Sequence, residues 1–238
     1  MTELLFRKDA YLREAQGTVR MVTDEGGIVL DRTVFYPTSG GQPGDSGTLQ
    51  WDDGAIDIAT TIKGPDDTVV LIPAEPLPLP RPGAAVRQAI AFDRRHRLMR
   101  MHTALHLLSV VIPRPVTGGS IASERSRLDF DMDAPPDDKD ALVRTLNDLI
   151  ACDFAVTEEF ISEAELDANP GLVKTLSVQP PRGAGQIRLI RIGAGENTAD
   201  LQPCGGTHVA RTAEIGEVRI GKIEKKGRQN RRVYLHLV

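Results

Sequence analysis

Cysteine and long apolar stretches are both scarce in this 238-residue sequence. Two cysteines, Cys152 and Cys204, cannot build a framework of disulfide bonds, and this favours a reducing compartment. No apolar run approaches the roughly 20 residues that a membrane-spanning helix requires. The first residues also lack the apolar core of a signal peptide. We therefore predict a cytoplasmic protein that does not bind membranes, in which Cys152 is a small buried residue.

Net charge is also small, at −4, but the charges are unevenly placed. Residues 219–232 contain seven basic residues and one acidic residue, so this segment carries +6 and the rest of the chain −10. A second basic cluster, residues 94–100, contains no acidic residue. Basic segments in an acidic protein favour a polyanionic partner such as a nucleic acid, although most charge runs are only solvated surface.

Two short motifs contain residues that bind metals. His102-Thr-Ala-Leu-His106 places two imidazoles four residues apart, on one face of a helix. Cys204-Gly-Gly-Thr-His208 joins a thiol and a third imidazole through two glycines that permit a sharp turn. Nitrogen and sulfur donors suit Zn²⁺ better than Mg²⁺ or Ca²⁺. The sequence therefore predicts one zinc site formed by both motifs; the alternative for the first motif is a pair of histidines satisfied by the core or by solvent.

The number of ligands bears on what the zinc ion would do. His102, His106, Cys204 and His208 together would close a tetrahedron, as in structural sites, whereas catalytic sites keep one position open. Either one ligand, for instance His208, yields to water or substrate, or zinc orders the pocket and other groups activate the water. We favour a catalytic or substrate-anchoring ion over a purely structural one.

The first ~90 residues are predicted to form β structure, because short β-branched and aromatic runs alternate there with turn signals. The expected strands are residues 17–21, 27–30, 33–36, 47–51, 55–62 and 68–72. This number of short strands fits a small barrel or sandwich. Residues 35–45 are too rich in Gly and Pro for a strand, and form either a tight connector or a loop that approaches a ligand closely.

Residues 75–83 alternate proline with other residues, which predicts a stiff linker and a domain boundary. We therefore expect two domains, residues 1–83 and 84–238, in a protein of the α+β class. The second domain should contain an antiparallel sheet and a helix that runs from Asp93, its N-cap, to about Val111 and bears the metal motif. The apolar face of that helix comprises Leu98, Met101, Leu105 and Leu108. Other expected elements are strands at 86–92, 127–131, 155–161, 187–192, 217–224 and 232–238, helices at 139–152 and 162–168, and a turn at 118–119.

Longer segments around both metal motifs resemble a known family. They are residues 97–109, 200–209, 212–216 and 225–232, together with the glycine-rich residues 35–47. In this order they resemble the AlaX family of alanyl-tRNA editing proteins, which share a domain with the editing regions of alanyl- and threonyl-tRNA synthetases. The N-terminal β-barrel is typical of the medium-length members. Leu105 departs from the related synthetase motif, which often has Thr between the two histidines.

The resemblance implies a trans-editing aminoacyl-tRNA hydrolase, which removes serine or glycine from mischarged tRNA(Ala) at a zinc ion. No ATP-binding signature is present, so no nucleotide cofactor is expected. Two alternatives belong to other classes. A zinc metalloprotease requires Glu at the position of Thr103. A non-catalytic RNA-binding protein with a structural zinc would keep the basic segments without the chemistry.

Ester hydrolysis needs a positioned water and stabilisation of the oxyanion. Candidate catalytic residues are Thr38, Gln42 and His106. Rejection of correctly charged Ala-tRNA(Ala) requires polar groups that are left unpaired when the serine hydroxyl is missing. The candidates for that selection are Thr38, Ser39, Gly40, Gly41 and Gln42. The candidate tRNA contacts, through phosphates, are Arg94, Arg95, Arg97, Arg100, Lys225, Lys226, Arg228, Arg231 and Arg232.

Overall fold

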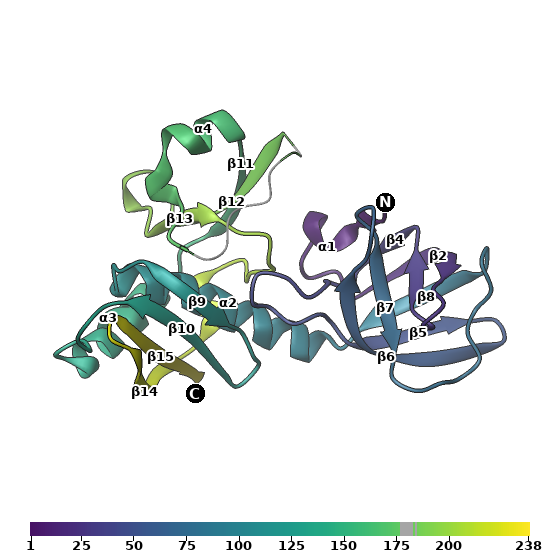
Figure 1. Cartoon of the computed structure of the whole chain (residues 1–238), viewed down its shortest axis with the longest axis horizontal. Coiled ribbons are helices and arrows are strands. Elements are labelled where there is room, and N and C mark those ends of the chain that lie inside the picture. Colours follow the sequence, from purple (N-terminus) through teal and green to yellow (C-terminus); the bar gives the residue numbers. More distant parts are fainter. Residues whose placement is uncertain (177–182, 184) are drawn as a thin grey trace. The chain divides into compact units, whose positions relative to one another are not determined.

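The chain forms two compact units, Met1–His96 and Arg97–Val238, in a computed structural model (Figure 1). The structure describes residues 1–176, 183 and 185–238. The boundary expected after Gly83 is corrected, because the next strand, β8 (Ala85–Ile90), closes the barrel of the first unit. No helix in these described residues is both long and apolar enough to cross a membrane.

The first unit is a closed six-stranded barrel in the order β2-β3-β7-β6-β5-β8, which confirms the predicted barrel. Its strands are β2 (Glu14–Val22), β3 (Ile28–Leu30), β5 (Gly47–Trp51), β6 (Gly54–Lys63), β7 (Val69–Pro73) and β8. Alternation between inward and outward side chains is clear in β6, where Ile56 and Ile58 are buried and their neighbours face out. Closure pairs every strand on both sides, so the sheet has no open edge.

The strand expected at residues 33–36 is largely wrong. Only Arg32–Thr33 (β4) is a strand, and it pairs in parallel with Glu3–Leu4 (β1), which precedes a short helix, Leu5–Lys8 (α1). Residues 34–36 are buried, but side chains satisfy their backbone N–H groups: Gln88 accepts from Val34 at 3.0 Å and Asp45 accepts from Tyr36 at 2.6 Å. The apolar run therefore reflected burial and not strand pairing.

The second unit is an α+β structure built on α2 (Phe92–Val111) from Arg97 onward. It has two antiparallel sheets, of four strands in the order β14-β15-β10-β9 and of three in the order β11-β12-β13, which Figure 1 shows as separate groups. These results confirm the expected α+β class. The strands are β9 (Val116–Ser120), β10 (Arg125–Asp131), β11 (Val156–Ser162), β12 (Gln186–Ile192), β13 (Asp200–Pro203), β14 (Val218–Gly227) and β15 (Asn230–Leu237). The other helices are α3 (Lys139–Ala151), α4 (Glu163–Ala168) and the short 3₁₀ turns Pro170–Leu172, Gly195–Asn197 and Thr212–Ile215.

Local signals predicted several of these elements well and missed others. The helix expected at residues 162–168 is α4, and Ser162 caps it in a capping box with Glu165. Helix α2 begins at Phe92, so Asp93 lies in its first turn and is not the N-cap. The turn expected at residues 118–119 is instead part of β9, paired with β10. Cys152 is exposed at the end of α3, which corrects its predicted burial.

Candidate metal centre

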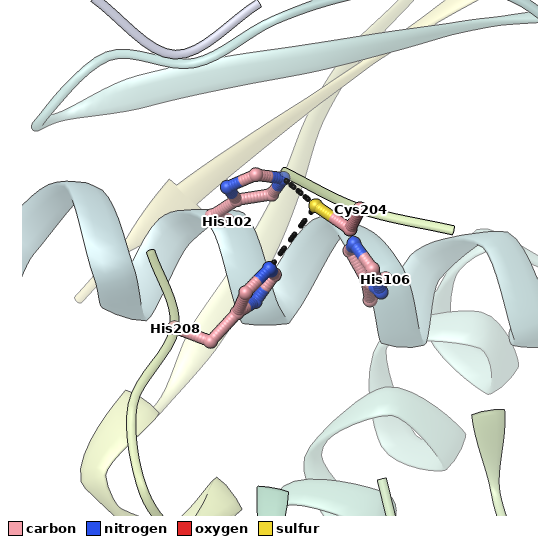
Figure 2. Close-up of side chains that lie close together, drawn as sticks. All are labelled: His102, His106, Cys204 and His208. Carbon is pink, nitrogen blue, oxygen red and sulfur yellow. Dashed lines mark hydrogen bonds between the residues drawn. The ribbon is translucent and has the colours of Figure 1, made fainter. Parts of the chain in front are cut away.

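Helix α2 presents both histidines of the first motif beside its apolar face. All four residues predicted to form that face are buried. His102 and His106 lie beside this face, one helical turn from each other, and are only 6% and 7% exposed. Their ring centroids are 5.3 Å apart, so both imidazoles turn toward one point, as Figure 2 shows.

The second motif follows β13 and is fixed by a neighbouring strand. Arg188 of β12 donates from Nη1 to the carbonyl oxygens of Cys204, at 2.7 Å, and Gly206, at 3.0 Å. In the other direction, the backbone N–H of Cys204 donates to the carbonyl of Arg188 at 3.2 Å. These contacts hold the turn between the two ligands. The Cys-Gly-Gly-Thr-His motif contains no signal for Arg188, and the sequence did not predict a role for this residue.

The structure brings all four predicted ligands together (Figure 2). One donor atom from each of His102, His106, Cys204 and His208 lies within 4.8 Å of the other three. The Sγ atom of Cys204 is 3.4 Å from Nε2 of His102 and 3.2 Å from Nε2 of His208. Three imidazole nitrogens and one sulfur that converge in this way could hold a metal ion, and the donor set fits zinc.

Asp200 orients the ring of His106 through its Nδ1 atom. Its Oδ2 lies 3.0 Å from Nδ1 of His106 and also accepts from Nε2 of Gln202 at 2.7 Å, while Oδ1 pairs with Nζ of Lys174. A proton on Nδ1 leaves Nε2 of His106 free for a metal. Burial by itself would lower the pKa of His106, but the hydrogen bonds and negative charges of Asp200 and Cys204 outweigh it and raise the pKa to about 9.

Thr103 orients His208 in the same way. Its hydroxyl donates to the carbonyl of Met99 at 3.0 Å, so it accepts at 3.1 Å from Nδ1 of His208, whose Nε2 then faces the sulfur. Burial and the nearby charge of His102 lower the pKa of His208 to about 3, which keeps this ring neutral. Thr103 stands where a metalloprotease has its glutamate, and its hydroxyl serves to position a ligand.

Cys204 has the environment of a thiolate. Burial of the sulfur would raise the pKa of the thiol, but the positive charge of His102 and the hydrogen bonds of His102 and His106 lower it well below its usual value. The backbone N–H of Gly206 also donates to Sγ at 3.4 Å. A thiolate is the form that binds metals, so the ligand is prepared before an ion arrives.

Asp200 and Gln202 were not predicted as functional, although a signal for them existed. Along a strand, alternate residues point to the same side. Asp200 and Gln202 of β13 and Cys204, just after it, follow this period, so Asp200 and Gln202 lie on the side that faces α2, as the predicted ligand Cys204 does. The approach of Lys174 from a different segment had no signal in the sequence.

The residues predicted for catalysis and selection in the glycine-rich loop lie in the first unit, whereas the four ligands lie in the second. Thr38 is exposed, and its hydroxyl donates to the carbonyl of Thr61 at 3.2 Å and accepts from the N–H of Gly44 at 2.8 Å. Ser39 and Gln42 pair through their backbones across a tight turn, and Gln42 is fully buried. The turn needs its glycines, because Gly40 and Gly41 have φ values of 56° and 81°.

The nine basic residues predicted to contact RNA fall into three groups. Arg95 and Arg231 are buried: Arg95 forms an ion pair with Asp45, and Arg231 donates to backbone carbonyls, so neither guanidinium is presented to solvent as a phosphate contact would require. Three others are partly buried and already have partners within the protein. Arg94 donates to the carbonyl of Gly44, Arg100 donates to the carbonyl of Ile215, and Arg232 forms an ion pair with Asp129. The exposed ones are Arg97, Lys225, Lys226 and Arg228.

Comparison with known proteins agrees with the geometry. Residues 187–234 match the family "Threonyl and Alanyl tRNA synthetase second additional domain", and residues 9–91 match "tRNA synthetases class II (A)". The protein "Alanyl-tRNA editing protein AlaX-M" of Methanosarcina barkeri is 38% identical over 255 residues, with 100% of both chains covered. Its namesake in Saccharolobus solfataricus is 34% identical, with 98% of both chains covered. The "Alanine--tRNA ligase" of Caldivirga maquilingensis is 32% identical over 94% of this chain and 25% of the ligase. These matches confirm the resemblance found in the motifs, and the chain belongs to the AlaX-M family of alanyl-tRNA editing proteins.

Proposed function

We propose that this protein hydrolyses the ester bond of tRNA(Ala) mischarged with serine or glycine, at a zinc ion held by the Cys/His₃ cluster. The convergence of the four donor atoms within 4.8 Å, in a chain of the AlaX-M family, carries the proposal. The names of its relatives, an editing protein for alanyl-tRNA and an alanine–tRNA ligase, support tRNA(Ala) as the substrate. A thiolate ligand is compatible with a reducing compartment such as the cytoplasm.

The cluster has the features that ester hydrolysis requires. A zinc ion bound there would polarise the ester carbonyl and activate a water molecule. Asp200 and Thr103 fix the rings of His106 and His208 so that each presents Nε2 to the ion. Preset ligands lower the cost of reorganisation during the reaction.

One ligand must yield if substrate or water is to reach the ion, because four protein donors close a tetrahedron. His208 is the candidate, since it lies outside regular structure and follows two glycines, whereas His102 and His106 are held in α2. Movement of a loop residue requires no change in the helix. Release of one ligand is what would distinguish a catalytic zinc from a structural zinc, whose four ligands stay bound.

Selection against alanine is assigned to the glycine-rich loop. The hydroxyl of Thr38 uses its proton and one lone pair within the loop, which leaves a second lone pair to accept from a serine hydroxyl. The side chain of Gln42 is buried, so we assign it to support of the turn together with Ser39. Gly40 and Gly41 are exposed and permit close approach of a substrate to the backbone.

The alternative is a non-catalytic RNA-binding protein with a structural zinc, which the closed ligand set favours. A deacylation panel separates the two: zinc-loaded protein with Ser-, Gly- and Ala-charged tRNA(Ala), beside a mischarged tRNA of another identity. We expect hydrolysis of the Ser and Gly esters of tRNA(Ala) alone, and its loss in Cys204→Ala protein that circular dichroism shows to be folded. If zinc-loaded parent protein hydrolyses Ser-tRNA(Ala) no faster than the uncatalysed reaction, the proposal is wrong and the zinc is structural.

A further inference from the structure

The four-stranded sheet of the second unit has one polar face that the proposed chemistry does not use. Side chains alternate along its strands, and one set is buried. The buried set includes Ser126, Phe130, Val218, Ile220, Val233 and Leu235. The opposite set forms what we call the polar face, made of Arg125, Arg127, Asp129, Asp131, Arg219, Lys222, Glu224, Asn230, Arg232, Tyr234 and His236.

Strand register brings these side chains into rows across the sheet. The first row joins Arg219, His236 and Arg125, because His236 of β15 pairs with Arg219 of β14 and with Arg125 of β10. In the next row Tyr234 pairs with Arg127. Three cationic residues, one of β14 and two of β10, therefore lie at or beside the positions that pair with His236 and Tyr234 of β15.

The third row, of Glu224, Arg232 and Asp129, contains two acids of the polar face, and the third acid, Asp131, pairs with Asn230 in the row beyond it. Asp129 accepts from Arg232 at 2.8 Å and from Arg127 at 2.6 Å, so one carboxylate serves two guanidinium groups. Glu224 lies 3.1 Å from Lys222. With His236 neutral, five cations and three anions leave this face with a charge of +2.

Arg125 and Arg219 provide the unneutralised charge. Both are exposed, and neither has a carboxylate within ion-pair distance among the residues that the structure describes. The guanidinium of Arg125 lies 4.8 Å from the centre of the Tyr234 ring, which holds it in place by a cation–π contact. A preset, unpaired guanidinium loses little side-chain entropy when it binds an anion.

His236 reports a positive potential at the same place. Burial and the charges of Arg219 and Arg125 lower its pKa below the usual value. Gly221 of β14 gives the ring room, because a Cβ at this position would lie 2.6 Å from Nε2 of His236 in its present orientation. Strand pairing places His236 between the two arginines.

We propose that the polar face binds the ribose–phosphate backbone of the tRNA substrate, with Arg125 and Arg219 as its principal phosphate contacts. The proposal rests on the proposed function, which makes the substrate an RNA. The unneutralised charge suits a polyanion. The ring of Tyr234 is covered by Arg125 and is not free to stack on a base, so the contact is expected to be independent of base sequence.

The test is the affinity of full-length protein for uncharged tRNA(Ala), measured by fluorescence anisotropy across a salt series. In the double variant Arg125→Gln with Arg219→Gln, we expect the Kd at physiological salt to rise roughly tenfold and the slope of log K against log salt to fall by about two. The same loss is expected with a tRNA of another identity. Arg125→Lys should retain most of the parent affinity, because it keeps the charge.

The matched control is Lys139→Gln with Arg144→Gln, which removes the same charge from two exposed residues of α3. We expect it to keep the Kd and the slope of the parent. An unchanged Kd in the polar-face variant, or an equal loss in the control, would overturn the proposal. Deacylation is measured separately: a parent protein that binds tRNA through this face yet hydrolyses no Ser-tRNA(Ala) refutes the proposed function and leaves the interface standing.

Discussion

Nδ1 of His106 and Oδ2 of Asp200 lie 3.0 Å apart, and this contact decides which ring nitrogen of His106 faces the ligand cluster. Without the carboxylate, the proton can move to Nε2 and block that donor. We predict that Asp200→Asn lowers the affinity for zinc about 10- to 100-fold, as the loss of an outer partner does in other metal sites. Competition with a chromophoric chelator measures the change.

The control for Asp200→Asn is Asp148→Asn, which makes the same chemical change at an exposed position of α3. It should bind zinc as the parent does. If Asp200→Asn also retains the affinity of the parent, the carboxylate does not orient His106, and the ring is held by packing in α2 alone.

The pH dependence of zinc binding follows from the same contact. In the metal-free protein the pKa of His106 is raised to about 9, so near neutral pH a proton occupies this ligand and must leave when zinc binds. Cys204, whose pKa is lowered, is already a thiolate. The apparent affinity should therefore rise about tenfold per pH unit from pH 7 and level off near pH 9.

Chelator competition from pH 7 to pH 9.5 measures this profile. Asp200→Asn removes the charge and the hydrogen bond that raise the pKa of His106, so its profile should level off at a lower pH than that of the parent. A parent profile that is flat from pH 7 upward would show that His106 carries no proton there.

Arg95 and Asp45 form a buried ion pair in the first unit, with 0% and 1% of their side chains exposed. Arg95 also donates to the carbonyls of Val34 and Ala10, at 2.7 Å and 3.0 Å. Asp45→Asn leaves a buried guanidinium without its counter-charge, so we predict a loss of about 3–5 kcal/mol in the free energy of unfolding. Urea unfolding followed by the fluorescence of Trp51, the single tryptophan and part of β5, reports this unit.

An exposed ion pair of the same unit provides the control. Arg87 and Glu14 keep 55% and 49% of their side chains exposed, so Glu14→Gln should cost less than about 1 kcal/mol. Equal losses in the two variants would mean that burial does not set the strength of the Arg95–Asp45 pair.

The case of Arg95 shows where sequence-based interpretation stops. Its basic cluster predicted a phosphate contact, but the residue that neutralises it, Asp45, is 50 positions away in the chain. Burial of a charge depends on such distant partners, and no local pattern reports them. Lys174, which pairs with Asp200 from another segment of the chain, likewise had no local signal in the sequence.

Periodicity and short motifs, by contrast, describe contacts within one element and were sufficient there. The four-residue spacing of His102 and His106 correctly predicted that both reach one site, and the helix expected at 162–168 was found, because a helix fixes such local distances by itself. The barrel was predicted, but its sixth strand is β8 and not residues 33–36, since buried apolar segments look alike whether or not they pair.

Thr38 provides the test of the proposed selection against alanine. Thr38→Val removes the only group of this side chain that could accept from a serine hydroxyl, and Thr38→Ser keeps it. We predict that the valine variant hydrolyses Ser-tRNA(Ala) with a kcat/KM about 10- to 100-fold lower, whereas the rate with Ala-tRNA(Ala) stays low, so that discrimination between the two falls. Initial rates of deacylation with both charged tRNAs measure the ratio.

The two substitutions also separate selection from folding. Valine leaves the N–H of Gly44 without its acceptor, at a cost of about 1–3 kcal/mol, so Trp51 fluorescence must first show that the barrel is folded. Serine restores that acceptor and should restore discrimination with it. Valine has no polar atom that could recognise serine. A folded Thr38→Val protein that still discriminates between the two charged tRNAs as well as the parent would therefore exclude the Thr38 hydroxyl as the group that selects serine.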